Sequence, residues 1–294
     1  MTVPGHGTPA REVVVPDPGS MVRWHRHSYP SPLARWHTHP EAELHLIRAG
    51  TGLAFVGDHV GRFEAGQLVL VGPHLPHNWI SDVAPGETVP DRDVLLQVHP
   101  DRVRALAEVA VEATEAVRLL DSARRGIRYS GATAAAGGDL LIAIGATDGL
   151  ERLQTLLRLL TLLSRAPQQD QQHLSRDLAP AGADPIAQQR VDVTLAHIAA
   201  HLDQPVRLPA VAALVGMTPS AFSRFFARAV GRGFAEMVRR LRVLRACALL
   251  AETDLPVAEI CYAVGYGNLS NFNRQFRTET GTTPRAYRRT ARGA

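Results

Sequence analysis

The feature that most constrains this chain is a segment that occurs twice near its C-terminus. Phe222-Ser223-Arg224-Phe225-Phe226 and Phe272-Asn273-Arg274-Gln275-Phe276 place phenylalanine, arginine and phenylalanine in the same order, fifty residues apart. Each copy ends at a glycine, Gly231 or Gly281, and each follows a short apolar segment that ends at another glycine. Glycine accepts the left-handed backbone that ends one helix and turns the chain into the next. The pattern therefore predicts two helix-turn-helix units in one chain.

The residues around these segments set the limits of the predicted helices. The apolar segments before the turns run from 209 to 216 and from 256 to 265. After the turns, Thr218 with Pro219, and Asn268, are residue types that favour helix N-termini. Apolar side chains recur at helical spacing from Phe234 to Glu252, which predicts one long helix joining the two units.

The second helix of a helix-turn-helix lies in the major groove of DNA, so its outward side chains are candidate contacts. Residues three and four apart share a helix face, which directs the five phenylalanines of the two copies inward. The expected DNA-contacting residues are Ser220, Ser223, Arg224, Arg228, Asn268, Ser270, Asn271, Asn273, Arg274 and Arg277. Arginine pairs with guanine and asparagine with adenine, whereas the last arginine of each helix is expected at phosphates. A single arginine would suit a solvated helix face equally well; the matched positions of Arg224 and Arg274 favour DNA.

The net charge differs in sign between the N-terminal and C-terminal parts of the chain. From Ile186 to the end there are 15 arginines and 7 acidic residues, a net charge of +8. The first 185 residues hold 17 arginines and 21 acidic residues, a net charge of −4. Neutralising phosphates supplies affinity for DNA, so the basic half is the half expected to bind it.

Upstream, short runs from about 21 to 98 alternate apolar and polar residues between turn signals such as Ala49-Gly50. This spacing predicts an antiparallel sandwich or barrel, preceded by a loose leader over residues 1–20. Its polar signature is His37-Thr38-His39-Pro40-Glu41-Ala42-Glu43, followed later by Gly72-Pro73-His74-Leu75-Pro76-His77. Alternate side chains of a strand share a face, so the histidines and glutamates of the first run are expected to point one way.

Imidazole and carboxylate ligands suit Zn, Ni, Mn or Fe, which makes this cluster a candidate metal site. The spacing of these residues is similar to that of the cupin motifs, and this resemblance implies His37, His39, Glu43 and His77 as the metal ligands. The same four residues, with Trp79, are the candidate ligand-binding residues. The alternative is a polar lining that hydrogen-bonds an effector without any metal, with Trp79 in an ordinary core. A similar run, Arg23-Trp24-His25-Arg26-His27, lacks the following Glu and Gly, and we interpret it as incidental.

The middle of the chain, from 99 to 166, has helical periodicity. Its last part, 150–164, carries more leucines than one helix needs to pack on its own domain, which suits either a homodimer interface or packing against the barrel and the preceding helices. Resemblance to regulators with a cupin domain, set out below, favours the homodimer. Residues 167–186 are polar and without periodicity, which predicts a flexible linker before a DNA-binding domain over 187–290.

Two family resemblances follow from these motifs. The run from Val264 to Phe276, with Gly281-Thr282-Thr283-Pro284 after it, resembles the DNA-binding domain of the AraC/XylS transcriptional regulators. The histidine and glutamate spacing upstream resembles the two motifs of the cupin barrel. His74 and Ser81 depart from that motif, which usually has a glycine and an asparagine there. The resemblances imply an α+β two-domain fold: an antiparallel cupin-like barrel with helices, then an all-α double helix-turn-helix.

The implied function is a transcriptional regulator whose barrel senses a small molecule, such as a sugar or other polar metabolite, and whose dimer binds double-stranded operator DNA. RNA polymerase is a further expected partner, and no enzymatic activity is expected. The alternative is a metal-dependent cupin enzyme fused to a DNA-binding domain; a third reading makes the barrel a dimerisation scaffold only. Cys247 and Cys261 are expected to be free and buried, and the lack of a leader or of a long apolar run predicts a cytoplasmic protein without membrane contact.

Overall fold

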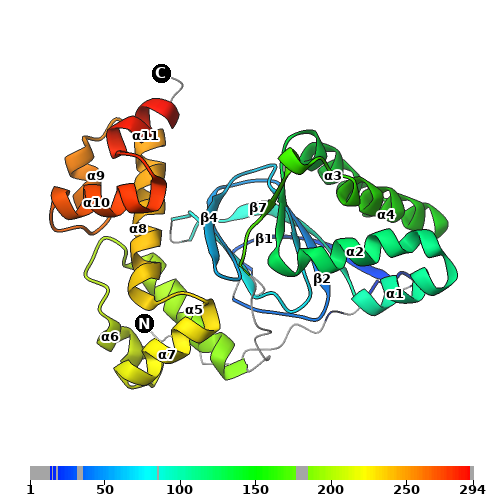
Figure 1. The fold of residues 1–294 in the computed structure, drawn as a ribbon, viewed down its shortest axis with the longest axis horizontal. Helices are drawn as coiled ribbons and strands as arrows, with labels where there is room; N and C mark the ends of the chain where they lie inside the picture. The colour runs from blue at the N-terminus through cyan, green and yellow to red at the C-terminus, as the bar shows by residue number, and fades with distance from the viewer. Residues whose placement is uncertain are drawn as a thin grey trace. The chain divides into compact units, whose positions relative to one another are not determined.

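The computed structural model describes residues 14, 16–17, 19–31, 36–84, 86–176 and 185–291. By their contacts the residues form two compact units, Met1–Gln188 and Gln189–Ala294 (Figure 1). Most of the expected leader, and residues 177–184 of the expected linker, lie outside the described residues.

The first unit contains two antiparallel sheets, and neither is closed on itself among the described residues. The larger sheet has the strand order β1 (Val22–Tyr29), β7 (Val89–Val98), β2 (Ala42–Ile47), β5 (Leu68–Val71), β8 (Ile127–Tyr129) and β9 (Gln171–His173). The smaller sheet has the order β4 (His59–Phe63), β3 (Gly52–Val56) and β6 (His77–Ser81). The expected antiparallel sheet domain is therefore present, as two sheets instead of one closed sheet.

The two faces of the large sheet differ in chemistry because side chains alternate along each strand. In β2, Leu44 belongs to the main apolar core together with Leu96 of β7 and leucines of the helices. Its neighbours Glu43 and His45 therefore point to the opposite face, where the rings of His77 and Trp79 from the small sheet meet them. Helices cover the apolar face: α1 (Pro100–Val109), α2 (Thr114–Ser122), α3 (Gly131–Ile144) and α4 (Gly149–Ser164) (Figure 1).

Two short strands differ from the sequence-based expectation. The structure has β8 inside the segment predicted to be helical, with Ile127 and Tyr129 buried on one side of it. It also has β9 inside the predicted linker, paired antiparallel with β8. Strands of three residues are too short to give a periodic signal, and their place at the sheet edge comes from pairing that only the tertiary fold supplies.

The chain is also anchored just after β9. The buried carboxylate of Asp58, in the turn between β3 and β4, accepts hydrogen bonds from Ser175 Oγ (2.8 Å) and from the backbone N–H of Arg176 (3.0 Å). The predicted linker is thus ordered up to residue 176, because its polar residues find partners in the first unit.

The second unit is helical throughout. Its helices are α5 (Pro185–Ala200), α6 (Leu208–Leu214), α7 (Pro219–Val230), α8 (Phe234–Glu252), α9 (Val257–Ala263), α10 (Leu269–Thr280) and α11 (Pro284–Ala291). The long joining helix has the limits that the sequence predicts. α8 is buried on most sides, for example at Met237, Leu241 and Leu250, because both helix pairs pack against it.

No single helix among the described residues is long and apolar enough to cross a membrane, although α6 and α7 together pass the same test while bent by 83°. Cys247 and Cys261 are free and buried, as the sequence predicts, and both belong to the apolar core around α9 and α10.

Candidate metal centre and candidate nucleic-acid interface

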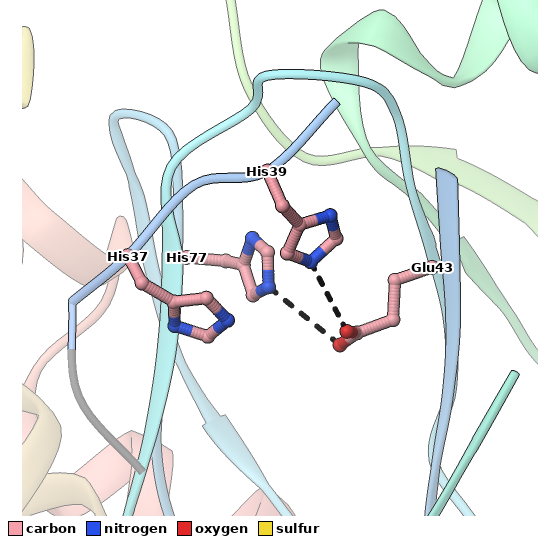
Figure 2. A group of neighbouring side chains, drawn as sticks. All are labelled: His37, His39, Glu43 and His77. Carbon is pink, nitrogen blue, oxygen red and sulfur yellow. Dashed lines mark hydrogen bonds and ion pairs between the residues drawn. The ribbon is translucent and has the colours of Figure 1, made fainter. Parts of the chain in front are cut away.

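Four side chains of the predicted polar cluster converge between the two sheets. His37 and His39 lie in the segment before β2, Glu43 lies in β2 and His77 begins β6 (Figure 2). One ligand atom from each lies within 4.8 Å of all the others. The prediction that the first run forms one strand face is wrong, since β2 begins only at Ala42. Convergence comes instead from a two-way backbone pairing of His37 with His77, with N···O distances of 3.2 and 3.0 Å.

The tautomers of two of these histidines follow from their backbone partners. Nδ1 of His39 lies 3.1 Å from the carbonyl oxygen of Glu41, and Nδ1 of His77 lies 2.8 Å from that of Leu75. Because a carbonyl only accepts, each Nδ1 donates its proton, so Nε2 carries a second proton in the charged ring and a lone pair in the neutral ring. These Nε2 atoms lie 3.2 and 3.6 Å from the buried Glu43 carboxylate, so the charged rings would donate to the carboxylate and the neutral rings would present acceptors to it. A cation between the neutral rings and the carboxylate would satisfy all three groups.

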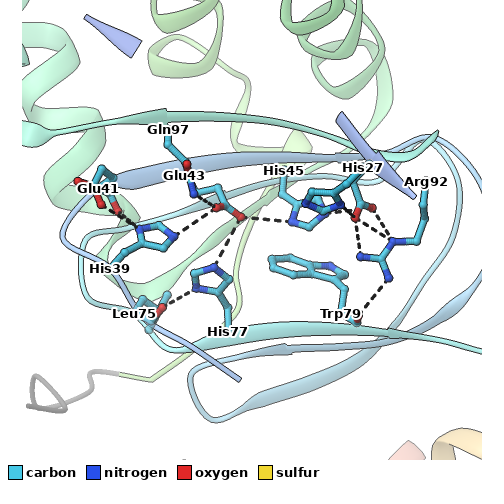
Figure 3. Close-up of polar contacts among 11 residues, drawn as sticks. His27, His39, Glu41, Glu43, His45, Leu75, His77, Trp79, Arg92 and Gln97 are labelled. Carbon is cyan, nitrogen blue, oxygen red and sulfur yellow. Dashed lines mark hydrogen bonds and ion pairs between the residues drawn. The ribbon is translucent and has the colours of Figure 1, made fainter. Parts of the chain in front are cut away.

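The Glu43 carboxylate also begins a polar network that runs deeper between the sheets (Figure 3). It accepts a hydrogen bond from Gln97 Nε2 (2.8 Å) and lies 3.4 Å from Nδ1 of His45. Nε2 of His45 lies 3.2 Å from Asp93, whose other oxygen lies 3.1 Å from Nδ1 of His27. The interior between the two sheets is therefore lined by a chain of alternating imidazoles and carboxylates.

The network shifts the ionisation of its members. Burial alone would raise the pKa of the Glu43 carboxyl, but hydrogen bonds with His39, His45 and His77 hold that pKa well below its usual value. Burial would lower the pKa of His45, but the carboxylates of Asp93 and Glu43 raise it. Both carboxylates thus stay charged inside the domain and favour cationic neighbours.

Part of this network was not found from the sequence. His45, Asp93 and Arg92 were not singled out, and the His25 and His27 run was interpreted as incidental, yet His27 contacts Asp93 directly. Arg92 is fully buried, donates to Asp93 Oδ1 (2.8 Å) and Trp79 O (3.1 Å), and stacks over a tyrosine ring at 4.6 Å. The one sequence signal for these residues is that they are polar within otherwise apolar strands, as His45 is in β2 and Asp93 is in β7.

Trp79 and His74 are the remaining sequence-derived features of this region. Trp79 is 3% exposed and lies in the apolar core of the small sheet, with its ring 3.9 Å from that of His45. Its Nε1–H has no acceptor among the described residues. His74 has a left-handed backbone (φ 60°), which explains why the cupin motif usually has glycine there. A non-glycine residue in that region costs about 1–3 kcal/mol.

The two predicted DNA-contacting helices repeat one another in burial as well as in sequence. In α7, Phe222 and Phe226 are buried and Phe225 is half-buried, not fully inward as predicted; in α10, Phe272 and Phe276 are buried. The candidate contacts that are exposed are Ser220, Ser223, Arg224, Arg228, Asn268, Ser270, Asn273, Arg274 and Arg277, whereas Asn271 is half-buried.

Both helices begin and end as the sequence predicts. The side-chain oxygens of Thr218 and Asn268 accept hydrogen bonds from backbone N–H groups three residues on, at 3.3 and 2.8 Å. Gly231 and Gly281 end the helices with φ of 71° and 74°. The guanidinium of Arg274 donates to Asn271 Oδ1 (2.9 Å), which holds the arginine along the exposed face.

A second set of contacts links α8 to the segment between α5 and α6 and to the turn between α9 and α10. Arg242 of α8 donates to the backbone oxygens of Leu202 (3.1 Å) and Gln204 (2.7 Å), in the segment between α5 and α6, and packs over the Tyr266 ring. Gly265, in the turn between α9 and α10, lies against the same carbonyl of Leu202. Arg242 thus joins the two helix pairs by a route separate from the apolar cores.

Both units of the chain are similar to known proteins. Residues 21–89 match the AraC-like ligand binding domain family, and residues 211–290 match a helix-turn-helix domain family. Regulatory protein SoxS of Salmonella typhimurium (strain LT2) is 32% identical over 101 residues, which cover 34% of this chain and 94% of SoxS. Regulatory protein PocR of the same strain is 38% identical over 94 residues, covering 32% of this chain but only 31% of PocR. The solved C-terminal domain of AraT, a response regulator from Geobacillus stearothermophilus, is 30% identical with a TM-score of 0.34, covering 37% of this chain and 88% of that domain.

A sheet domain with a polar interior and a helical domain with a helix-turn-helix match define a transcriptional regulator that carries its own ligand-binding domain. The chain belongs to the AraC family of transcriptional regulators, which confirms the resemblance carried by the repeated C-terminal segment.

Proposed function

We propose that the protein binds operator DNA through two helix-turn-helix units per chain, with α7 and α10 as the helices that enter the major groove. The observation that carries the proposal is the matched burial of these helices, which presents Arg224 and Arg274 outward over buried phenylalanines at equivalent positions. Exposed serine and asparagine side chains accompany each arginine, as direct readout of base edges requires. The basic surplus of this half supplies attraction to phosphates.

The test begins with an operator obtained by repeated selection from random duplexes with the full-length chain. Arg224→Ala and Arg274→Ala should each weaken binding to that operator by about 5- to 150-fold, since a bidentate contact to guanine contributes about 1–3 kcal/mol. Each variant should also lose its preference at one base pair while keeping the others. Arg118→Ala, at an exposed position on α2 outside the groove along α3 and α4, is the matched control. Wild-type affinity and base preference in both arginine variants would contradict the assignment.

For the first unit, we infer a cupin-type sensor in which the two facing sheets hold a divalent ion between His37, His39, Glu43 and His77. The inference is supported by the Nε2 atoms of His39 and His77, which face a charged, buried carboxylate while each Nδ1 is held by a backbone carbonyl. A bound Zn, Ni, Mn or Fe ion would supply an electrophilic centre for an oxygen atom of an effector. Trp79, with its unpaired Nε1–H, would orient that effector.

Titration with Co²⁺ tests the inference, because histidine and carboxylate ligands give cobalt a visible absorption band. Glu43→Gln preserves the shape of the side chain but removes its charge, and should weaken Co²⁺ binding by at least about tenfold. Glu64→Gln, at an exposed position, is the control and should bind like the wild type. Equal Co²⁺ binding by the two variants would show that the histidine cluster is a polar lining and not a metal centre.

We also infer that α4 forms the interface of a homodimer. Its inner leucines, Leu156, Leu159 and Leu163, pack in the core, whereas Leu150 is 84% and Leu157 38% exposed. These two outward leucines line a shallow groove of about 870 Å³ along α3 and α4. A second copy of the same helix would cover that apolar stripe. An effector that binds one arrangement of the dimer more tightly than another would then change DNA binding.

A further inference from the structure

A cavity of about 530 Å³ lies in the first unit, outside the histidine cluster. It opens between the turn that joins β5 to β6, the start of α1 and the residues that follow α2. Its apolar lining residues are prolines and leucines, among them Pro40, Pro73, Leu75 and Pro76. The volume is that of an ordinary small-molecule site.

The charges around this cavity are not balanced. Among its lining residues, Arg104 is paired with Asp101 (2.8 Å) and lies 3.9 Å from Asp121. Arg125 donates to the backbone oxygen of Ser175 (2.9 Å). The side chain of Arg124 has no hydrogen bond or ion pair with any described residue, and the three lining arginines exceed the two lining aspartates, Asp101 and Asp121, by one positive charge.

The strained residue of the turn between β5 and β6 also lines the cavity. His74 is exposed at the cavity wall, and its side chain has no partner among the described residues. Its left-handed backbone (φ 60°) would suit glycine better, so an imidazole is kept there at a cost in stability. Strain at a ligand-facing residue is typical of a binding site.

We propose that this cavity binds a small organic anion, namely a carboxylate with an apolar body, at a site separate from the histidine cluster. Arg124 pairs with the carboxylate, the His74 imidazole hydrogen-bonds to it, and the apolar body packs on the proline and leucine wall. The proposal goes beyond the proposed function, since it requires neither a bound metal nor DNA.

The site is nonetheless placed to affect the histidine cluster. The backbone N–H of His74 donates to the carbonyl of His39 (2.8 Å), and His77 follows in the same turn with Nδ1 held by the Leu75 carbonyl. A ligand on this turn therefore contacts the segment that positions two of the four clustered side chains.

The test is calorimetric titration of the full chain with cyclohexanecarboxylate and with its neutral analogue cyclohexanecarboxamide. We expect the carboxylate to bind with a millimolar or lower Kd and the amide at least about tenfold more weakly. Arg124→Gln should weaken carboxylate binding by about tenfold or more, as loss of a charged hydrogen-bond partner does. Arg118→Gln, at an exposed position on α2 outside the cavity, is the matched control.

A second variant separates a binding role from a structural one. His74→Gly should raise the urea midpoint of the first unit, because it relieves the left-handed strain, and yet weaken carboxylate binding severalfold. The proposal is overturned if the wild type binds neither compound at millimolar concentration, if the amide binds as well as the carboxylate, or if Arg124→Gln binds normally. Loss of binding in Glu43→Gln with retention in Arg124→Gln would place the ligand in the histidine cluster and also overturn it.

Discussion

The two turn glycines of the second unit offer a matched pair of perturbations with different expected costs. Gly216 lies in the turn between α6 and α7 with a φ of 67°, and Gly265 lies in the turn between α9 and α10 with a φ of 84°. An added Cβ at Gly216 meets nothing within 4 Å, whereas at Gly265 it would lie 2.2 Å from the carbonyl oxygen of Leu202 and 2.8 Å from Arg242 Nη2. Alanine is therefore strained by the left-handed backbone at either position, but only Gly265→Ala must also displace the carbonyl of Leu202.

The magnitudes follow from these contacts. The left-handed backbone costs an L-residue about 1–2 kcal/mol, which is the whole effect expected for Gly216→Ala. At Gly265 the displaced Leu202 carbonyl also loses its 3.1 Å hydrogen bond from Arg242 Nε, and a bond to a charged donor contributes about 1.5–3 kcal/mol. We expect a total of about 3–5 kcal/mol for Gly265→Ala, roughly 2 kcal/mol more than for Gly216→Ala.

Native-state hydrogen exchange of the buried amides of α10, in the full-length chain, measures this difference directly. Tryptophan fluorescence during urea unfolding is the internal control, because Trp24, Trp36 and Trp79 all lie in the first unit and should report no change. Equal losses of protection in the two alanine variants, or a larger loss for Gly216→Ala, would refute the role given to Arg242 and Leu202.

The remaining predictions concern the core, the acid response and the oligomer. Phe272→Ala removes a fully buried ring between Tyr266 and Phe276 and should destabilise the second unit by about 3–5 kcal/mol, measured by urea unfolding followed by circular dichroism. Burial, aided by the nearby Arg23 charge, lowers the pKa of His25 to about 4, so below pH 6.5 the unfolded chain takes up a proton that the folded chain does not. The stability of the first unit should therefore fall by roughly 2–3 kcal/mol between pH 6.5 and 4, and His25→Gln should remove that part of the pH dependence of fluorescence-detected unfolding. If α4 forms the proposed dimer, Leu150→Glu should convert it to a monomer in sedimentation equilibrium without changing the circular dichroism spectrum; a dimer that persists in the variant would place the interface elsewhere.

The second unit is the part that sequence reasoning predicts best. The limits of α8, the caps Thr218 and Asn268 and the buried phenylalanines all follow from local rules of helix formation. Short-range signals suffice there because helix ends depend on residues three or four apart. Phe225 is the exception, since how deeply a ring is buried depends on the neighbouring helices and not on its own helix face.

The first unit is predicted less completely, for a physical reason. His39, Glu43 and His77 are recognisable because their spacing repeats a motif, but Asp93 meets His27 and His45 only through the antiparallel register of β7 with β1 and β2. This register pairs Asp93 with residues 66 and 46 positions earlier, His27 and Ile47, and no local pattern encodes it. The strands β8 and β9 are missed for the same reason.

The buried Asp58 carboxylate also decides how firmly the last described residues of the first unit are held. Ser175 and Arg176 both bond to this one carboxylate, on the turn between β3 and β4, so a single side chain fixes the segment that follows β9 to the small sheet. An Asp58→Ala variant would remove the acceptor of both hydrogen bonds, and the backbone amide of Arg176 should then exchange with solvent faster than in the wild type.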